Sequence, residues 1–185
     1  MNYLGTLLNS FNQKYSFTIK EEEEIQDYSS KFRLYKGRKS DKDISVFMMD
    51  LKRNSQLACL GANAYKKTKS IKFPSIISFV DGVQEDDKII LCTEYVTPLS
   101  RNLLDSSNDV LLWGLYAIGK SVEFLSKQGI IHGNLNIASV FVTKSGEWKL
   151  SGLEYSATSV DEFIQMMPNN DLHLPRGTYS ITRAK

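Results

Sequence analysis

The chain has 185 residues, a formal net charge of +2 and only two cysteines, a length that suits one domain or a two-lobed domain with a sizeable core. The small net charge gives no argument for a nucleic acid or membrane partner, and Cys59 and Cys92 form neither a disulfide framework nor a metal-ligand pattern. A cytoplasmic protein is expected, because no apolar run reaches the roughly 18 residues of a membrane span and no secretory signal is recognisable.

The first part of the chain predicts β-structure. After an expected leader over residues 1–14, alternating apolar and polar residues over 15–19 predict a strand. The acidic run at 21–24 is expected to be a solvated loop. Two further strands are predicted at 32–37 and 44–51, joined by a charged turn.

The middle of the chain predicts a helix followed by a hairpin. Residues 55–70 form the helix, with Ser55 as a plausible N-cap and Asn63 as a weak helix former. Four residues at helical spacing mark its inner face: Leu57, Leu60, Ala64 and Thr68. Residues 76–83 and 89–96 then predict two strands around a polar turn.

A long helix is predicted from Asp109, as its cap, to Gly129. Its apolar stripe comprises Leu111, Leu115, Ile118, Val122 and Leu125. A second hairpin is predicted at 140–150, with Trp148 largely buried because an exposed indole would waste its apolar area. After Tyr155 only one short helix, near 160–166, is expected.

Residues 129–155 resemble the catalytic and metal loops of protein kinases, which usually read His-Arg-Asp-Leu-Lys-x-x-Asn and, after a hairpin, Asp-Phe-Gly. His132 and Leu135 keep this pattern. The catalytic aspartate is replaced by Asn134, the metal-binding asparagine by Ser139, and the metal-binding aspartate by Gly152. His132 is therefore expected to hold the loop backbone instead of taking part in catalysis.

The nucleotide-binding pattern of the kinase small lobe is degenerate as well. The glycine-rich loop falls on residues 27–32, which contain no glycine and add the negative charge of Asp27. Phe47 stands where the phosphate-pairing lysine of V-A-I-K is expected, and Ala64 is nearest to the position of its glutamate partner. Lys52 lies five residues further along, too far along a strand to substitute.

Residues 94–96 resemble a kinase hinge, whose backbone would meet an adenine ring, although a plain connector between lobes fits equally well. This vestigial hinge consists of Glu94, Tyr95 and Val96. No catalytic residue, metal ligand or cofactor is expected from these patterns.

The pieces together resemble the SCY-like (N-terminal-kinase-like) pseudokinases over roughly residues 17–155. The most specific segments are YKGRK at 35–39, SVFMMDLK at 45–52, FPSIISFVDG at 73–82, TEYVTPLS at 93–100 and ASVFVTKSGEWKLSGLEY at 138–155. The resemblance implies an α+β, two-lobed, catalytically inactive kinase-like domain. The small lobe would span 15–97, and an incomplete large lobe with an irregular tail would span 98–185.

The same resemblance implies a role as scaffold or adaptor. Family members act in vesicle traffic between Golgi and endoplasmic reticulum, through coatomer or clathrin, and some act in nuclear tRNA export. A cytoplasmic location is implied, with peripheral Golgi association through partners and no direct DNA binding. The chain departs from the family by lacking its helical HEAT-type repeats, which leaves partners carried by those repeats open.

Two alternatives stand beside this reading. An atypical kinase with weak ATP binding is disfavoured, because phosphoryl transfer needs a held metal ion and a carboxylate that positions the attacking hydroxyl. A truncated fragment with no independent role remains open from the sequence.

Overall fold

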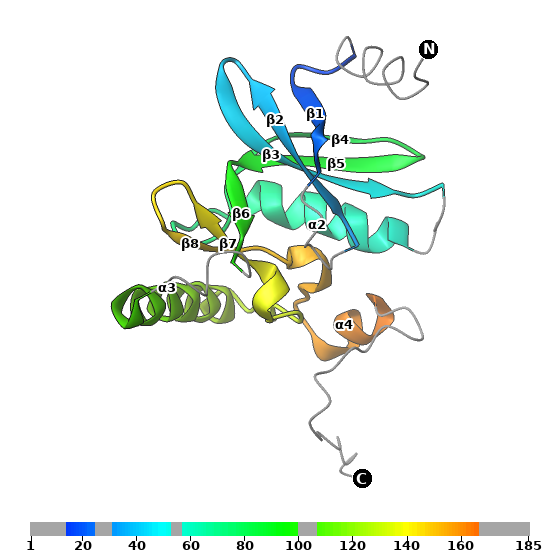
Figure 1. The fold of residues 1–185 in the computed structure, drawn as a ribbon. Helices are drawn as coiled ribbons and strands as arrows, with labels where there is room; N and C mark the ends of the chain where they lie inside the picture. Colours follow the sequence, from blue (N-terminus) through cyan, green and yellow to red (C-terminus); the bar gives the residue numbers. More distant parts are fainter. Residues whose placement is uncertain (1–13, 25–30, 53–56, 100–106, 167–185) are drawn as a thin grey trace.

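The computed structural model describes residues 14–24, 31–52, 57–99 and 107–166 (Figure 1). Two antiparallel sheets organise this part of the chain. One has five strands in the order β1-β2-β3-β5-β4, and the other has three in the order β6-β7-β8. Helix α2 crosses one face of the larger sheet, and α3 lies against the smaller one (Figure 1).

The larger sheet is built from β1 (Thr18–Glu24), β2 (Arg33–Lys39), β3 (Lys42–Asp50), β4 (Phe79–Gln84) and β5 (Lys88–Glu94). The predicted loop at 21–24 is wrong, because these residues continue β1 and Glu24 pairs with Tyr35 after an irregularity in the register. Backbone pairing with β2 here overrides the local polarity. Ser40 and Asp41 turn the β2–β3 hairpin with positive φ angles of 45° and 64°, so both strands continue further toward the turn than predicted.

Helix α2 (Ala58–Ser70) turns the predicted face inward, since Leu60, Ala64 and Thr68 are buried. Its N-terminal cap position is held by Leu57, which makes no side-chain capping bond. Ser55, the predicted N-cap, lies outside the described residues.

Helix α3 (Asn108–Lys127) is capped by Ser107, whose Oγ accepts a hydrogen bond from the Val110 N–H at 3.4 Å. Asp109, predicted as the cap, lies in the first turn instead. The predicted apolar stripe is also wrong at Leu115, which is 62% exposed. Gly114 faces the smaller sheet in its place. The exposed apolar residues of this helix are Val110, Leu112, Trp113, Leu115 and Tyr116.

The smaller sheet combines β6 (Val96–Pro98), β7 (Val140–Thr143) and β8 (Trp148–Leu150). The predicted 140–150 hairpin is confirmed, and so is the burial of Trp148, which is 7% exposed. The predicted strand over 89–96 is divided at Tyr95, where the chain leaves β5 and enters β6. The lobe boundary expected between residues 97 and 98 falls within β6 and stays a prediction.

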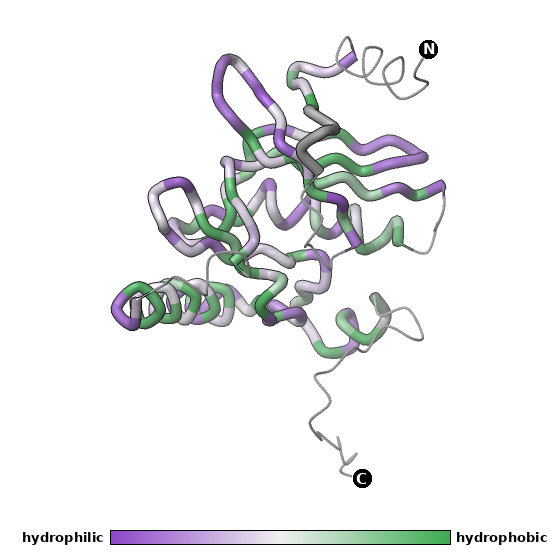
Figure 2. Tube along the Cα trace, viewed as in Figure 1, coloured by the Kyte–Doolittle hydropathy of each residue, from purple (hydrophilic) through white to green (hydrophobic). Residues whose placement is uncertain are grey.

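Short elements complete the described part: η3 (Ile137–Ser139), η4 (Leu153–Tyr155) and α4 (Val160–Met166). The helix predicted near 160–166 is thus confirmed. One core cluster joins the larger sheet, α2, Phe141 and Tyr155, and another lies between α3 and the smaller sheet around Trp148. Figure 2 shows hydrophilic tips on the hairpins of the larger sheet and apolar segments toward its centre. Among the described residues, no helix is both long and apolar enough to cross a bilayer.

Candidate functional site

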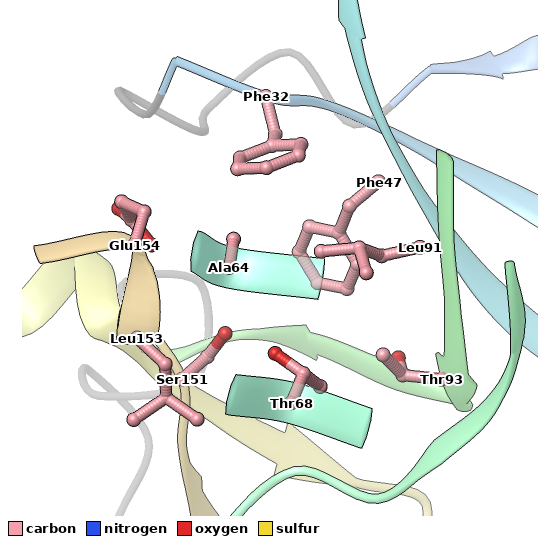
Figure 3. Close-up of a pocket in the computed structure, with 9 residues that line it drawn as sticks. All are labelled: Phe32, Phe47, Ala64, Thr68, Leu91, Thr93, Ser151, Leu153 and Glu154. Atoms are coloured by element: carbon pink, nitrogen blue, oxygen red, sulfur yellow. The ribbon is translucent and has the colours of Figure 1, made fainter. Parts of the chain in front are cut away.

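Several of the residues that the kinase resemblance singles out line one small cavity between the larger sheet, α2 and η4 (Figure 3). Its walls are formed by Phe32, Phe47, Ala64, Thr68, Leu91, Thr93, Ser151, Leu153 and Glu154. The cavity holds about 10 Å³, roughly the room of one water molecule. Sites for small molecules usually enclose a few hundred Å³, so this cavity is far smaller than a usual ligand site.

Phe47 fills the place where a lysine was expected. It pairs across the sheet with Leu34 on one side and Leu91 on the other, and it is 4% exposed. Its ring meets Phe141 edge-on, with centroids 5.4 Å apart and planes at 85°. Phe32, also 4% exposed, closes the cavity from the sheet side (Figure 3). Residues 27–30 of the segment predicted as the glycine loop, which include Asp27, lie outside the described part of the chain.

The α2 wall offers no partner for a phosphate-binding lysine. Ala64 is 2% exposed and presents only a methyl group to the cavity. The Lys52 Nζ lies 2.9 Å from an Asp87 carboxylate oxygen, and its side chain is 73% exposed. Lys52 is therefore engaged at the surface and does not line the cavity, in agreement with the sequence argument against it.

His132 holds the loop that follows α3 and is itself buried, at 6% exposed. Its Nδ1 accepts a hydrogen bond from the Asn134 N–H at 3.3 Å, which leaves the proton on Nε2 to be donated to the Ser151 carbonyl at 2.7 Å. Burial lowers the pKa of His132, so the ring is neutral at physiological pH. This arrangement supports the structural role expected of the residue.

Asn134 and Ser139 use their side chains within the same loop. The Asn134 Oδ1 accepts a hydrogen bond from the Asn136 side chain at 2.7 Å, and its Nδ2 lies 3.4 Å from a Glu154 carboxyl oxygen. The Ser139 Oγ donates to the Asn136 carbonyl at 2.7 Å and accepts from the Asn136 N–H at 3.1 Å. These bonds fix the backbone turn, which is a different task from holding magnesium.

Gly152 occupies a turn that has no space for an aspartate. Its φ of +79° lies in the left-handed region that side-chain-bearing residues rarely adopt. A Cβ there would come within 2.8 Å of the Ser139 Cβ and 3.4 Å of the His132 Cε1. The described part of the chain holds no group of three or more His, Cys, Asp or Glu residues that could bind a metal ion.

The three residues predicted as a vestigial hinge contact other residues of the chain. The Val96 N–H donates to the Ser45 Oγ at 3.0 Å, and the Ser45 hydroxyl donates back to the Val96 carbonyl at 2.9 Å. Ser45 is fully buried, so the N–H and the carbonyl of Val96 are both paired inside the protein. Glu94 accepts from the Ser78 N–H at 2.9 Å, and the Tyr95 ring lies under the Lys144 ammonium at 4.8 Å.

Sequence reasoning missed Asn63, which fastens α2 to η4. Its Nδ2 donates to the carbonyl oxygens of Glu154 at 2.9 Å and Ser156 at 2.8 Å. The local pattern shows only a poor helix former, because these partners are 91 and 93 residues away along the chain. The Ser45 pairing was missed for the same reason.

Glu154, also missed, is a carboxyl group enclosed by the cavity wall and is 5% exposed. Burial raises its pKa above the ordinary value of 4.5. At pH values below 4.5, Glu154 is protonated in both the folded and the unfolded chain, and its contribution to the stability of the fold is fully present. As the pH rises through the raised folded-state pKa, stability is lost because ionisation is easier in the unfolded chain.

We therefore expect Glu154→Gln, which keeps an acceptor oxygen for Asn134 and cannot ionise, to gain stability relative to the native chain as the pH increases. Urea unfolding midpoints measured at about pH 4 and about pH 7 give the comparison. Glu147→Gln, at an exposed carboxyl on the β7–β8 turn, serves as the matched control for the substitution itself. A gap between Glu154→Gln and the native chain that shrinks toward pH 7 would contradict the assignment.

No protein-family model matches the chain. The "Probable inactive serine/threonine-protein kinase scy1" of Dictyostelium discoideum is 32% identical over 145 residues, which are 75% of this chain and 18% of that protein. "Cytoplasmic export protein 1" of Saccharomyces cerevisiae is 26% identical over 158 residues, 83% of this chain and 20% of that one. Among solved structures, the crystal structure of Cex1p is 25% identical with a TM-score of 0.72, covering 84% of this chain and 30% of that chain. The chain thus spans about a fifth of the length of these two relatives.

Proposed function

Because the chain carries the protein-kinase-like domain of the SCY-like pseudokinase family, we propose that it serves as a scaffold or adaptor that binds protein partners. The predicted α+β, kinase-like fold is confirmed by the likeness to the Cex1p structure. The domain is a pseudokinase, as its inactive-kinase relative bears out. In this proposal, a domain that keeps the kinase-like fold without kinase activity works by binding partners on its surface.

The observation that carries the proposal is the internal filling of the nucleotide site. Kinases hold ATP through the glycine loop, the lysine pair, the metal ions and the hinge. In the described part of this chain, Phe47 lies in the sheet at the position expected for the lysine. The Ser45 hydroxyl forms hydrogen bonds with the N–H and the carbonyl of Val96. The left-handed turn at Gly152 leaves no space for an aspartate side chain. This filling supports a domain that works as a scaffold without binding a nucleotide.

We expect no rise in the melting temperature of the chain when ATP is added at millimolar concentration, with or without magnesium. A ligand present at 100 times its dissociation constant would add about 2.7 kcal/mol, a shift of several degrees for a domain of this size. An active protein kinase measured under the same conditions is the positive control. A magnesium-dependent rise in this chain would overturn the proposal and favour the atypical kinase.

The cellular role that we propose is in traffic between Golgi and endoplasmic reticulum, with the domain acting in the cytoplasm and reaching the Golgi periphery through coatomer or clathrin. The family resemblance supports this role. A second candidate, nuclear tRNA export, is favoured by the relative named as a cytoplasmic export protein. Cosedimentation of the chain with purified coatomer or purified clathrin tests the first role, and absence of binding to both would favour the second.

A further inference from the structure

Eight lysines in the described part of the chain have a carboxylate partner. Ion pairs are formed by Lys14, Lys39, Lys52, Lys88, Lys120, Lys127, Lys144 and Lys149. Four lysines at the end of α2 and just after it form none with a described residue: Lys66, Lys67, Lys69 and Lys72. We call these four the α2 lysine surface. They concentrate positive charge in seven residues of a chain whose net charge is only +2.

Two lysines of the α2 lysine surface, Lys69 and Lys72, lie over a pair of aromatic rings. Tyr65 and Phe79 meet edge-on, with centroids 5.6 Å apart. The Lys69 Nζ lies 5.7 Å from the Tyr65 ring centre, and the Lys72 Nζ lies 5.7 Å from that of Phe79. Cation–π contacts of this kind favour particular positions for the ammonium groups. Groups already held in place lose less conformational freedom when a partner binds.

An acidic carboxylate of the chain already lies in the field of this surface. Hydrogen bonds from Thr158 are the main reason why the pKa of Glu162, on α4, is lowered, and the charges of Lys67 and Lys66 lower it further. The positive charge of Lys66 and Lys67 thus favours the ionised form of a carboxylate on a neighbouring segment of the same chain.

The surroundings of the lysines argue against two other anionic partners, a nucleic acid and a lipid bilayer. Tyr65 and Phe79 are only partly exposed and face each other, and the Tyr65 hydroxyl donates to the Gly82 carbonyl at 3.2 Å, so neither ring is an open platform for a nucleobase. Between residues 57 and 79 no large apolar side chain is exposed that could enter a bilayer.

From these observations we infer that the α2 lysine surface docks an acidic segment of a protein partner. The inference rests on the proposed scaffold function and deepens it, because it gives one surface and one partner chemistry to that function. None of the four lysines lines the cavity described above.

Fluorescence anisotropy of labelled poly-L-glutamate, titrated with the full chain at low salt, tests the inference. We expect binding that weakens as salt rises from about 50 to about 200 mM, because exposed charge pairs are screened. The variant Lys66→Gln/Lys69→Gln/Lys72→Gln should bind about tenfold more weakly. The matched control Lys42→Gln/Lys120→Gln/Lys127→Gln changes the net charge equally and should bind like the native chain. Circular dichroism melting curves check that both variants fold.

Equal weakening in both triple variants would show attraction by net charge alone and overturn the inference. Absence of binding to the native chain would overturn it too. Tighter binding of poly(U) RNA, or of phosphatidylserine vesicles, than of poly-L-glutamate would assign the surface to a different class of partner. The nucleotide experiment is independent of this titration, so a failure of the scaffold proposal through ATP binding can be told apart from a failure of the docking surface.

Discussion

Replacing Trp148 with alanine is expected to lower the free energy of unfolding by about 3 to 5 kcal/mol. Trp148 is 7% exposed and joins β8 to α3. The helix lies so close to the indole that a Cβ added at Gly114 would come within 2.2 Å of the Trp148 Cδ2. Removing the ring leaves a void between β8 and α3, and a loss of this size is a large part of the total stability of a domain.

The matched control for this prediction is Trp113→Ala. Trp113 is 70% exposed on α3, where its ring stacks on Tyr116 with centroids 5.7 Å apart. We expect it to cost only about 0.5 kcal/mol, as surface substitutions do. These are the only two tryptophans, so each variant also reports on the remaining indole by fluorescence. Urea unfolding gives the midpoints, and an unchanged midpoint for Trp148→Ala would refute the structural role given to that residue.

Phe47→Lys, which restores the residue that an active kinase carries, is expected to destabilise the domain by about 3 kcal/mol or more. The substitution removes a buried ring that packs edge-on against Phe141 and places an ammonium group among Phe32, Leu91 and the wall of the 10 Å³ cavity. We also expect no response to ATP and magnesium from this variant, because Gly152 and the Ser45–Val96 pairing remain.

Phe47→Leu is the matched control, since it keeps an apolar side chain at the site and should cost about 1.5 kcal/mol or less. Chemical denaturation of both variants, followed by melting curves with and without ATP and magnesium, gives the two readouts. If Phe47→Lys were as stable as Phe47→Leu and its melting temperature rose with ATP and magnesium, the nucleotide site would have been blocked by this one residue alone.

The sequence by itself determined the elements whose signals are local. The 140–150 hairpin follows from alternating residues around a turn, and the inner face of α2 follows from the spacing of Leu60, Ala64 and Thr68. The burial of Trp148 follows from its large apolar area. The departures from the kinase pattern at Asn134 and Gly152 are equally visible in the sequence, because neither residue carries the carboxylate that the kinase pattern has at these positions.

The tertiary structure alone decided what depends on distant partners. Asn63 reaches carbonyl groups 91 and 93 residues away, and the Ser45 hydroxyl meets Val96 across 51 residues, so no local pattern could reveal either bond. The acidic residues up to Glu24 form a strand because β2 supplies backbone partners. Gly114 faces the sheet, and Leu115 faces solvent, because the bulk of Trp148 excludes a larger side chain at that contact. Periodicity identifies a face of a helix, whereas the shape of the neighbouring side chains fixes its rotation.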